Sequence, residues 1–267
     1  MKIVSDNTFY LDAIKFVDTN AKHIRQPNGT HTGTVVFFAD TDLNTFVYRF
    51  PTKSLALKNH NLVPWLKRYN IPTPKTTLYN YCGTLFEKYT YNTNKTMFEH
   101  NMSSHLSDYE LFTIYQECMQ IEYNISKIPV SNVDKIAHKS YSRLYYTSYI
   151  AKHNKTINTI IKTAIIYIMS HIGEMRFFHN DINPTNVLLT PDKHVFSVID
   201  VDGISLTNTY FALINMLRFA PQHMWMDLLR YYEKISHKQQ PKKLVITTMK
   251  LITLIKKSWT NNRLTLR

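Results

Sequence analysis

Asp181, Asn186 and Asp200 are the residues of this chain whose types and spacing are best suited to chemistry. Asp181 and Asn186 lie in a polar segment that begins at His179, and Asp200 directly follows an apolar run. Carboxylate and amide oxygens are ligands that Mg²⁺ accepts, and a positioned carboxylate can take the proton of a hydroxyl group. We therefore expect these side chains to converge on a metal ion, a nucleotide phosphate and an attacking hydroxyl.

The segment after Asn186 predicts the hairpin that would bring these groups together. Two short aliphatic and β-branched runs, 187–189 and 195–199, flank a turn at Pro191 and Asp192. The second run ends on two carboxylates, Asp200 and Asp202. A loop, a hairpin and acids at a strand end would place the two acids beside the polar segment.

Helical patterns dominate the C-terminal part of the chain. Ser107 and Glu110 have the form of a capping box, which predicts the start of a helix. Isoleucines at helical spacing over 157–172 predict a central buried helix that ends at Gly173, just before the polar segment. Further helices are expected at 141–149, 210–219, 224–235 and 244–259.

The N-terminal part is rich in strand signals. Aromatic and β-branched residues over 34–38 and 45–50 predict two strands joined by a hairpin loop. An apolar side over 55–69 predicts a helix that Pro64 would shorten or kink. Two further strands are expected at 76–81 and 84–91, and a linker or surface loop at 91–104. Together with the strand signals that begin at residue 21, these elements predict a small lobe of five strands and one helix.

Residues 27–33 hold two of only five glycines, and glycine lets backbone N–H groups approach a phosphate closely. This segment is therefore a candidate nucleotide loop, although an ordinary turn would carry the same residues. Arg49 lies on the second expected strand and could reach a phosphate, or it could be an exposed arginine on a half-solvated sheet.

The composition limits the class of protein. A hydrophobic content of 44% excludes wholesale disorder, and Cys82 and Cys118 form no disulfide framework. No signal peptide or membrane span is expected, so we expect a soluble, cytoplasmic protein, with peripheral membrane contact left open. The net charge is +13, and residues 203–267 carry eleven Lys or Arg against Asp227 and Glu233, a net charge of +9. This excess favours an anionic partner, or it is a solvated basic surface.

The motif H-N-D-x-x-x-x-N at 179–186, followed by I-D-x-D at 199–202, resembles the choline/ethanolamine kinase and aminoglycoside phosphotransferase group of the protein-kinase-like fold. The His-Asn-Asp triplet is similar to the choline kinase branch in particular. The resemblance implies an α+β protein with an N-terminal nucleotide-binding lobe, 1–90, and a C-terminal catalytic and substrate lobe, 91–267. It also implies ATP, Mg²⁺ and a small-molecule hydroxyl acceptor.

The resemblance assigns roles to individual residues. It implies that Asp181 is the catalytic base, that Asn186 and Asp200 hold Mg²⁺, that His179 braces the catalytic loop, and that Asp202 is a second metal ligand or a support. It implies that Arg49 binds phosphate. Nucleotide-loop positions would be Asn28, Gly29, Thr30 and Gly33, and main-chain groups of a hinge within 85–89, including Glu87, Lys88 and Tyr89, would hold adenine.

Two departures from the family pattern leave a second class open. The helix after Arg49 should present a glutamate to this cation, but residues 58–61 contain no acid. An aspartate that braces the catalytic loop is expected about twelve residues after Asp200, where Ala212 stands, and Asn208 replaces another frequent aspartate. A kinase-fold binding or regulatory protein without turnover is therefore the alternative to an enzyme.

The acceptor is the least determined part of the prediction. Choline and aminoglycosides are cations, whereas the expected substrate lobe is basic, so an anionic acceptor such as a phosphorylated sugar or a glycolipid fits the charge better. A protein acceptor is disfavoured because no D-F-G or A-P-E segment is present. Nucleic-acid binding is suggested by charge alone, without a recognition motif.

Overall fold

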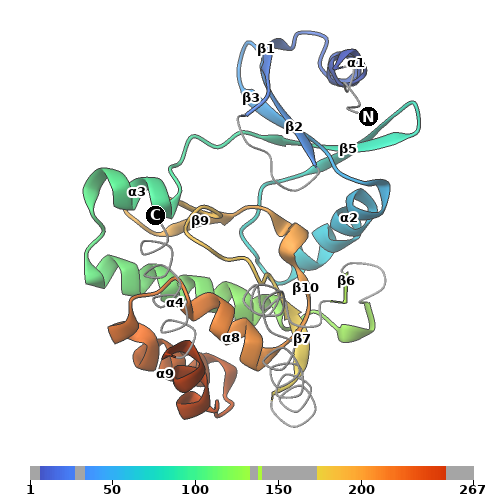
Figure 1. Cartoon of the computed structure of the whole chain (residues 1–267). Coiled ribbons are helices and arrows are strands. Elements are labelled where there is room, and N and C mark those ends of the chain that lie inside the picture. Colours follow the sequence, from blue (N-terminus) through green and yellow to red (C-terminus); the bar gives the residue numbers. More distant parts are fainter. Residues whose placement is uncertain (1–6, 28–33, 133–137, 140–172, 251–267) are drawn as a thin grey trace, which may run out of the picture.

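The computed structural model of the chain describes residues 7–27, 34–132, 138–139 and 173–250. A sheet-rich N-terminal lobe lies above a larger, mostly helical lobe (Figure 1), so the predicted two-lobed α+β fold is confirmed. The helices expected over 141–149 and 157–172 and the glycine-bearing segment 28–33 lie outside the described residues. The exact boundary between the lobes, expected after residue 90, stays a prediction.

The N-terminal lobe is built on a five-stranded sheet in the order β1-β2-β3-β5-β4. Every neighbouring pair is antiparallel, and β3 and β5 pair with a strand on each side. The strand positions predicted from aromatic and β-branched residues are confirmed to within two residues at each end. The strands are β1, Lys22–Arg25; β2, Val35–Asp40; β3, Thr45–Phe50; β4, Thr77–Tyr81; and β5, Thr84–Thr90.

Helix α1, Thr8–Val17, corrects the expectation of a single helix in this lobe. Its buried residues Ala13 and Ile14 pack with Phe37 and Phe86 of the sheet in a small core separate from that of the C-terminal lobe. The packing explains why so short a helix is stable, since tertiary burial contributes more to helices of this length than intrinsic propensity does.

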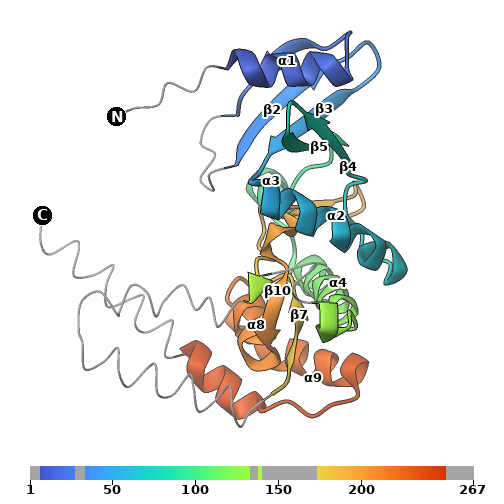
Figure 2. The same cartoon turned by 90° about the vertical axis from the view of Figure 1, so that its right-hand side faces the viewer.

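Helix α2, Lys53–Arg68, lies at the junction between the sheet and the helices of the C-terminal lobe (Figure 2). Thr52 caps its first turn by accepting a hydrogen bond from the N–H of Leu55. The helix continues past Pro64, so of the two expected effects of this proline, shortening or kinking, the shortening is wrong. Leu62 and Leu66, on either side of the proline, are buried in the larger core, and this packing offsets the one helical hydrogen bond that proline removes.

The C-terminal lobe combines helices with two small sheets. Helix α3 forms where a loop was expected, because Thr96 and Glu99 make a capping box that starts it without any apolar periodicity. The sheets are the three strands β6-β10-β7 and the predicted hairpin β8-β9. The elements are α3, Met97–Ser104; α4, Asp108–Ile125; β6, His138–Lys139; β7, Met175–Phe178; β8, Val187–Leu189; β9, Val195–Val198; β10, Ser205–Asn208; α8, Thr209–Leu217; α9, Trp225–Ser236; and a helical segment at 242–250.

Helices α4, α8 and α9 form the body of the large core. Ile114, Cys118, Ile121 and Ile125 form a buried apolar stripe on α4, and α8 is buried at all but one of its nine positions. Strand β7 packs against α4 and ends at the polar segment that begins at His179. Among the described helices none is long and apolar enough to cross a membrane.

Candidate functional site

The polar loop begins with a tight turn that requires a special backbone conformation. Strand β7 ends at Phe178, and Asn180 has a φ of 61°, in the left-handed region. Asparagine tolerates this region better than other non-glycine residues. Its side-chain Nδ2 donates to the Phe178 carbonyl and to the Ser205 Oγ, both at 2.8 Å. The turn therefore explains why asparagine precedes Asp181.

Asp181 is held by two amide side chains of its own loop. Its carboxylate accepts hydrogen bonds from Asn183 Nδ2 at 3.1 Å and from Asn186 Nδ2 at 3.2 Å. Arg218 Nη2, from the end of α8, lies 3.5 Å from Asp181 Oδ1. The Asp181 side chain nevertheless keeps 37% of its surface exposed. A fixed carboxylate that remains open to solvent can accept a proton from a bound hydroxyl group.

His179 is a structural member of the loop. It is buried, and its Nε2 donates to the Ile199 carbonyl at 3.2 Å, directly before Asp200. Burial lowers the pKa of His179 to about 4, against the opposing effect of Asp181. The imidazole is therefore neutral at pH 7 and connects the polar loop to the end of the hairpin.

Gly203 allows the loop and the segment after the hairpin to approach closely. A Cβ atom at this position would lie 2.5 Å from the main-chain oxygen of His179 and 3.4 Å from the Asp181 Cβ. The first distance is shorter than any ordinary contact, so a side chain here would displace the loop that carries Asp181.

Asp200 lies beside Asn186 because the hairpin folds as predicted. The Ile199 N–H donates to the Asn186 carbonyl at 2.9 Å, which continues the β8-β9 pairing to the start of the acidic segment. Asp200 has a φ of 61°, and its side chain is 39% exposed. Burial, and then the neighbouring Asp202, raise the pKa of Asp200. A nearby cation would relieve this accumulation of negative charge.

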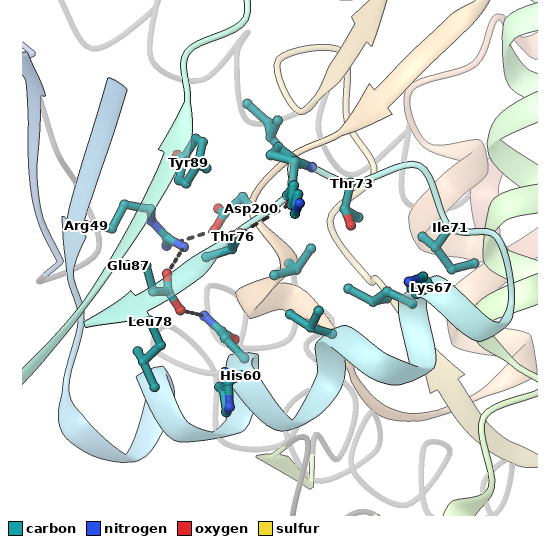
Figure 3. Close-up of a pocket in the computed structure, with 17 residues that line it drawn as sticks. Arg49, His60, Lys67, Ile71, Thr73, Thr76, Leu78, Glu87, Tyr89 and Asp200 are labelled. Atoms are coloured by element: carbon teal, nitrogen blue, oxygen red, sulfur yellow. Dashed lines mark hydrogen bonds and ion pairs between the residues drawn. The ribbon is translucent and has the colours of Figure 1, made fainter. Parts of the chain in front are cut away.

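Arg49 reaches from β3 to the acidic segment of the other lobe (Figure 3). Its Nη2 lies 2.6 Å from Asp202 Oδ2 and 3.6 Å from Asp200 Oδ1, and its Nη1 donates to Glu87 Oε2 at 3.1 Å. Burial alone would lower the pKa of Arg49, but Asp202 and Glu87 raise it above its usual value. The arginine is thus a buried, fully charged group surrounded by three carboxylates.

Asn59 on α2 completes this cluster. Its Nδ2 donates to Glu87 Oε1 at 2.8 Å and to Asp202 Oδ1 at 2.7 Å. The acid that pairs with Arg49 therefore comes from β5, and the helix contributes a neutral donor in place of the expected glutamate. The exposed-surface alternative for Arg49 is wrong, because its side chain is only 12% exposed.

The hinge interpretation of residues 85–89 needs correction for two of the three named residues. Glu87 and Lys88 lie inside β5, where each pairs with a residue of β3 on one side and of β4 on the other. Their side chains make specific contacts as well: Glu87 accepts a hydrogen bond from Arg49, and Lys88 donates to Asp18 at 2.7 Å. Tyr89 lies beyond the last β4 pair, so its main chain has a β3 partner only.

A cavity of about 540 Å³ adjoins Arg49 and Asp200. Its walls come from α2, β4, β5 and the segment after β9, and Figure 3 shows Arg49, Glu87, Tyr89 and Asp200 gathered at one end of it. Tyr89 and Glu87 contribute polar groups, whereas Val63, Leu66 and Leu78 make it partly apolar. Asp200 therefore lies next to a space that is large enough for part of a small molecule.

Two of the three residues predicted to hold a magnesium ion have oxygens that could do so. Asp200 and Asn186 offer carboxylate and amide oxygens, and Mg²⁺ needs only one or two protein ligands when phosphates and water complete its coordination. Asp202 does not fit, because both of its oxygens are bound by Arg49 and one also by Asn59. Over the described residues, no three Asp, Glu, His or Cys side chains form a metal-binding group.

Three residues at the site were missed by sequence reasoning. Asn183 is inside the motif, and its spacing of two from Asp181 is typical of a loop-stabilising side chain. Glu122 is four residues after the buried Cys118, so its acid lies on the apolar face of α4, which is the signal that could have revealed it. Arg218 gives no signal in its local sequence.

The nucleotide-loop candidates Asn28, Gly29, Thr30 and Gly33 lie outside the described residues.

The two lobes, joined by Arg49 over a loop and hairpin, define the protein-kinase-like fold found in small-molecule phosphotransferases. No protein-family model and no curated protein matches the chain. Solved structures do match. The GDP complex of aminoglycoside 2'-phosphotransferase-IIIa is similar with a TM-score of 0.68 and 13% identity, over 96% of this chain and 93% of that one.

Two further solved structures are similar over most of their length. The macrolide 2'-phosphotransferase MphH of Brachybacterium faecium has a TM-score of 0.65 and 12% identity, covering 91% of this chain and 88% of that one. Aminoglycoside phosphotransferase APH(2'')-Ib with ADP bound has a TM-score of 0.61 and 14% identity, covering 93% and 87%. At these identities the likeness establishes the fold.

Proposed function

We propose that the protein is an ATP- and Mg²⁺-dependent phosphotransferase that moves the γ-phosphate of ATP to a hydroxyl group of a small molecule. The observation that supports this best is the contact of Arg49 with Asp200 and Asp202, which are about 150 residues away in sequence. The contact brings a cation of the sheet to the acids beside the loop that holds Asp181. Phosphoryl transfer depends mainly on such positioning and charge neutralisation.

In the proposed reaction Asp181 accepts the proton of the acceptor hydroxyl. The hydroxyl oxygen forms its bond to the γ-phosphorus while the bond from that phosphorus to the bridging β-γ oxygen breaks, and ADP leaves. Asn183 and Asn186 hold the carboxylate in place for this step. Asp200 and Asn186 would hold Mg²⁺, which would neutralise phosphate charge when bound. The segment 28–33 is the proposed nucleotide loop.

We infer that the acceptor carries a negative charge. Arg218, whose side chain is 10% exposed, is paired with Asp181 Oδ1 at 3.5 Å, so the two charges balance each other at the point where the acceptor hydroxyl must bind. The pair therefore leaves no unbalanced carboxylate to attract a cationic acceptor at this point. The net charge of +9 over residues 203–267 favours an anionic acceptor.

Transfer assays with the purified protein test this proposal. ATP and GTP are supplied in parallel with Mg²⁺, since the similar structures hold ADP or GDP. The acceptor panel contains anionic sugars and glycolipids, with choline, aminoglycosides and macrolides for comparison. Asp181→Asn should lower the transfer rate about 10²- to 10⁴-fold and leave nucleotide binding unchanged. Asp192→Asn, an acid in the exposed turn of the same hairpin, is the matched control and should retain full activity.

Full activity of Asp181→Asn would overturn the assignment of the base and with it the mechanism. Nucleotide binding without transfer to any acceptor would favour the alternative, a kinase-fold binding protein. That alternative is supported by Asp202, whose oxygens are occupied by Arg49 and Asn59 rather than available to a metal ion.

A further inference from the structure

Glu122 is an acid in the middle of the large core. It lies on α4, its exposed surface is 3%, and its neighbours along the helix face, Cys118 and Ile125, are buried apolar residues. Burial raises the pKa of Glu122 to about 7, although two main-chain N–H groups oppose this effect. An ionisable group is kept in such a place only when specific partners compensate for its lost hydration.

The partners of Glu122 belong to the catalytic loop. Its Oε2 accepts the main-chain N–H of His179 at 2.7 Å, and the nearby main-chain N–H of Asn180 favours the charged carboxylate. These are the two residues directly before Asp181. Their N–H groups would otherwise lie beyond the end of the β7-β10 pairing, which stops at Phe178 and Ser205.

The hydrogen bond from His179 to Glu122 fixes the orientation of the peptide group at the start of the turn that leads to Asp181. Asn180 adopts its left-handed conformation between this bond and the side-chain bonds to Phe178 and Ser205. A carboxyl group that receives the His179 N–H therefore helps to determine where the loop turns. When the acid is ionised this bond is charge-assisted, and such bonds are about twice as strong as neutral ones.

Glu122 also explains how the loop is held without the acid expected after Asp200. Ala212, at that position, is a buried residue of α8, and Asn208 is occupied as the N-cap of α8, where its Oδ1 accepts from the Tyr210 N–H at 2.9 Å. We propose that Glu122 is the positioning residue that braces the catalytic loop from α4 and makes the acid missing at Ala212 unnecessary. This inference rests on the proposed phosphotransferase function.

The chain offers a matched control on the same helix. Glu117 of α4 also accepts a main-chain N–H through its carboxylate, that of Val195 in β9 at 2.6 Å, and it contacts His194. It braces the hairpin on the side of the turn, away from Asp181. Removing Glu117 therefore tests the loss of an acid from α4 without the loss of the bond to the catalytic loop.

The experiment compares Glu122→Ala, Glu122→Gln and Glu117→Ala in the full chain, by steady-state kinetics and by hydrogen exchange of main-chain amides. Glu122→Ala should lower kcat about 100-fold with the KM for nucleotide unchanged, since a displacement near 1 Å at the reacting group has this effect. Glu122→Gln keeps an acceptor oxygen and should restore kcat to within about tenfold of the wild type. Glu117→Ala should leave kcat unchanged.

Hydrogen exchange decides the inference independently of turnover. The amide of His179 should be protected in the wild type, exchange at least tenfold faster in Glu122→Ala, and stay protected in Glu117→Ala. If the wild type transfers no phosphate to any acceptor, the proposed function fails while this exchange pattern still tests the brace. If Glu122→Ala does not fold, the wild type and Glu122→Gln carry the test. Rapid exchange of the His179 amide in the wild type, or normal kcat in Glu122→Ala, would overturn the proposal.

Discussion

Replacing Asn59 by aspartate would place a further carboxylate, between those of Glu87 and Asp202, where the structure has a shared hydrogen-bond donor. Asn59 Nδ2 lies 2.8 Å from Glu87 Oε1 and 2.7 Å from Asp202 Oδ1, and Asn59 itself is 6% exposed. Two unit charges 4 Å apart interact by about 4 kcal/mol at an effective dielectric constant of 20. Asn59→Asp therefore creates two repulsions of this size, which Arg49 offsets in part.

The new carboxylate would escape this repulsion by taking up a proton. Its pKa in the folded protein would be raised above its value in the unfolded chain, so the folded state would lose stability as the pH rises through the raised value. We expect Asn59→Asp to cost about 3 to 5 kcal/mol at pH 8, the usual cost of an uncompensated buried charge. At pH 5 most of this cost should disappear, because the protonated acid donates to one of its neighbours.

Urea unfolding of the wild type, Asn59→Asp and Asn59→Ala between pH 5 and pH 8 measures these differences. Asn59→Ala removes the same two hydrogen bonds without adding a charge, so its cost should change little with pH relative to the wild type. The reasoning is refuted if Asn59→Asp is within about 1 kcal/mol of the wild type at pH 8. It is also refuted if the two variants show the same dependence on pH.

Three further substitutions test other parts of the site. Gly203→Ala should lower the transfer rate about 100-fold in a folded protein, as judged by circular dichroism, because its Cβ would meet the His179 oxygen at 2.5 Å; an unchanged rate would contradict this. The pKa of Glu122 is raised from 4.5 to about 7. As the pH rises between these two values, the stability of the wild type should fall relative to that of Glu122→Gln by about 1.4 kcal/mol per pH unit. Urea unfolding that gives the same stability difference between the two proteins at pH 5 and pH 8 would contradict this. Arg218→Gln should lower kcat/KM for anionic acceptors about tenfold or more and for neutral ones much less, and equal losses would remove the case for an anionic acceptor.

The parts of the fold that could be predicted are those with a local signal. Strands β2 and β3 have aromatic and β-branched runs, and α4 combines a capping box with an apolar stripe. Strand β10 could not be found this way, because its four residues are all buried and show no alternation of polar and apolar side chains. Helix α3 was missed for a related reason, although its capping box was visible in the sequence.

The same distinction applies to the site. The proximity of Asp181, Asn186 and Asp200 could be predicted because a loop and a hairpin of about twenty residues connect them. The bonds of Arg49 to Asp202 and of Glu122 to His179 join residues separated by 153 and 57 positions, and only packing of the lobes and of α4 determines them. Residue type alone does not indicate which distant acid a buried cation or a turn will recruit.

The differences between this chain and the motif pattern that it resembles are explained by acids that lie on other elements of the fold. An electrostatic interaction depends on the position of a carboxylate and not on the element that carries it. Glu87 on β5 supplies the acid that residues 58–61 lack, and Glu122 on α4 supplies one that Ala212 cannot. Acids missing at expected positions therefore do not by themselves indicate an inactive protein, because both groups that they would hold, Arg49 and the loop before Asp181, are held by other acids.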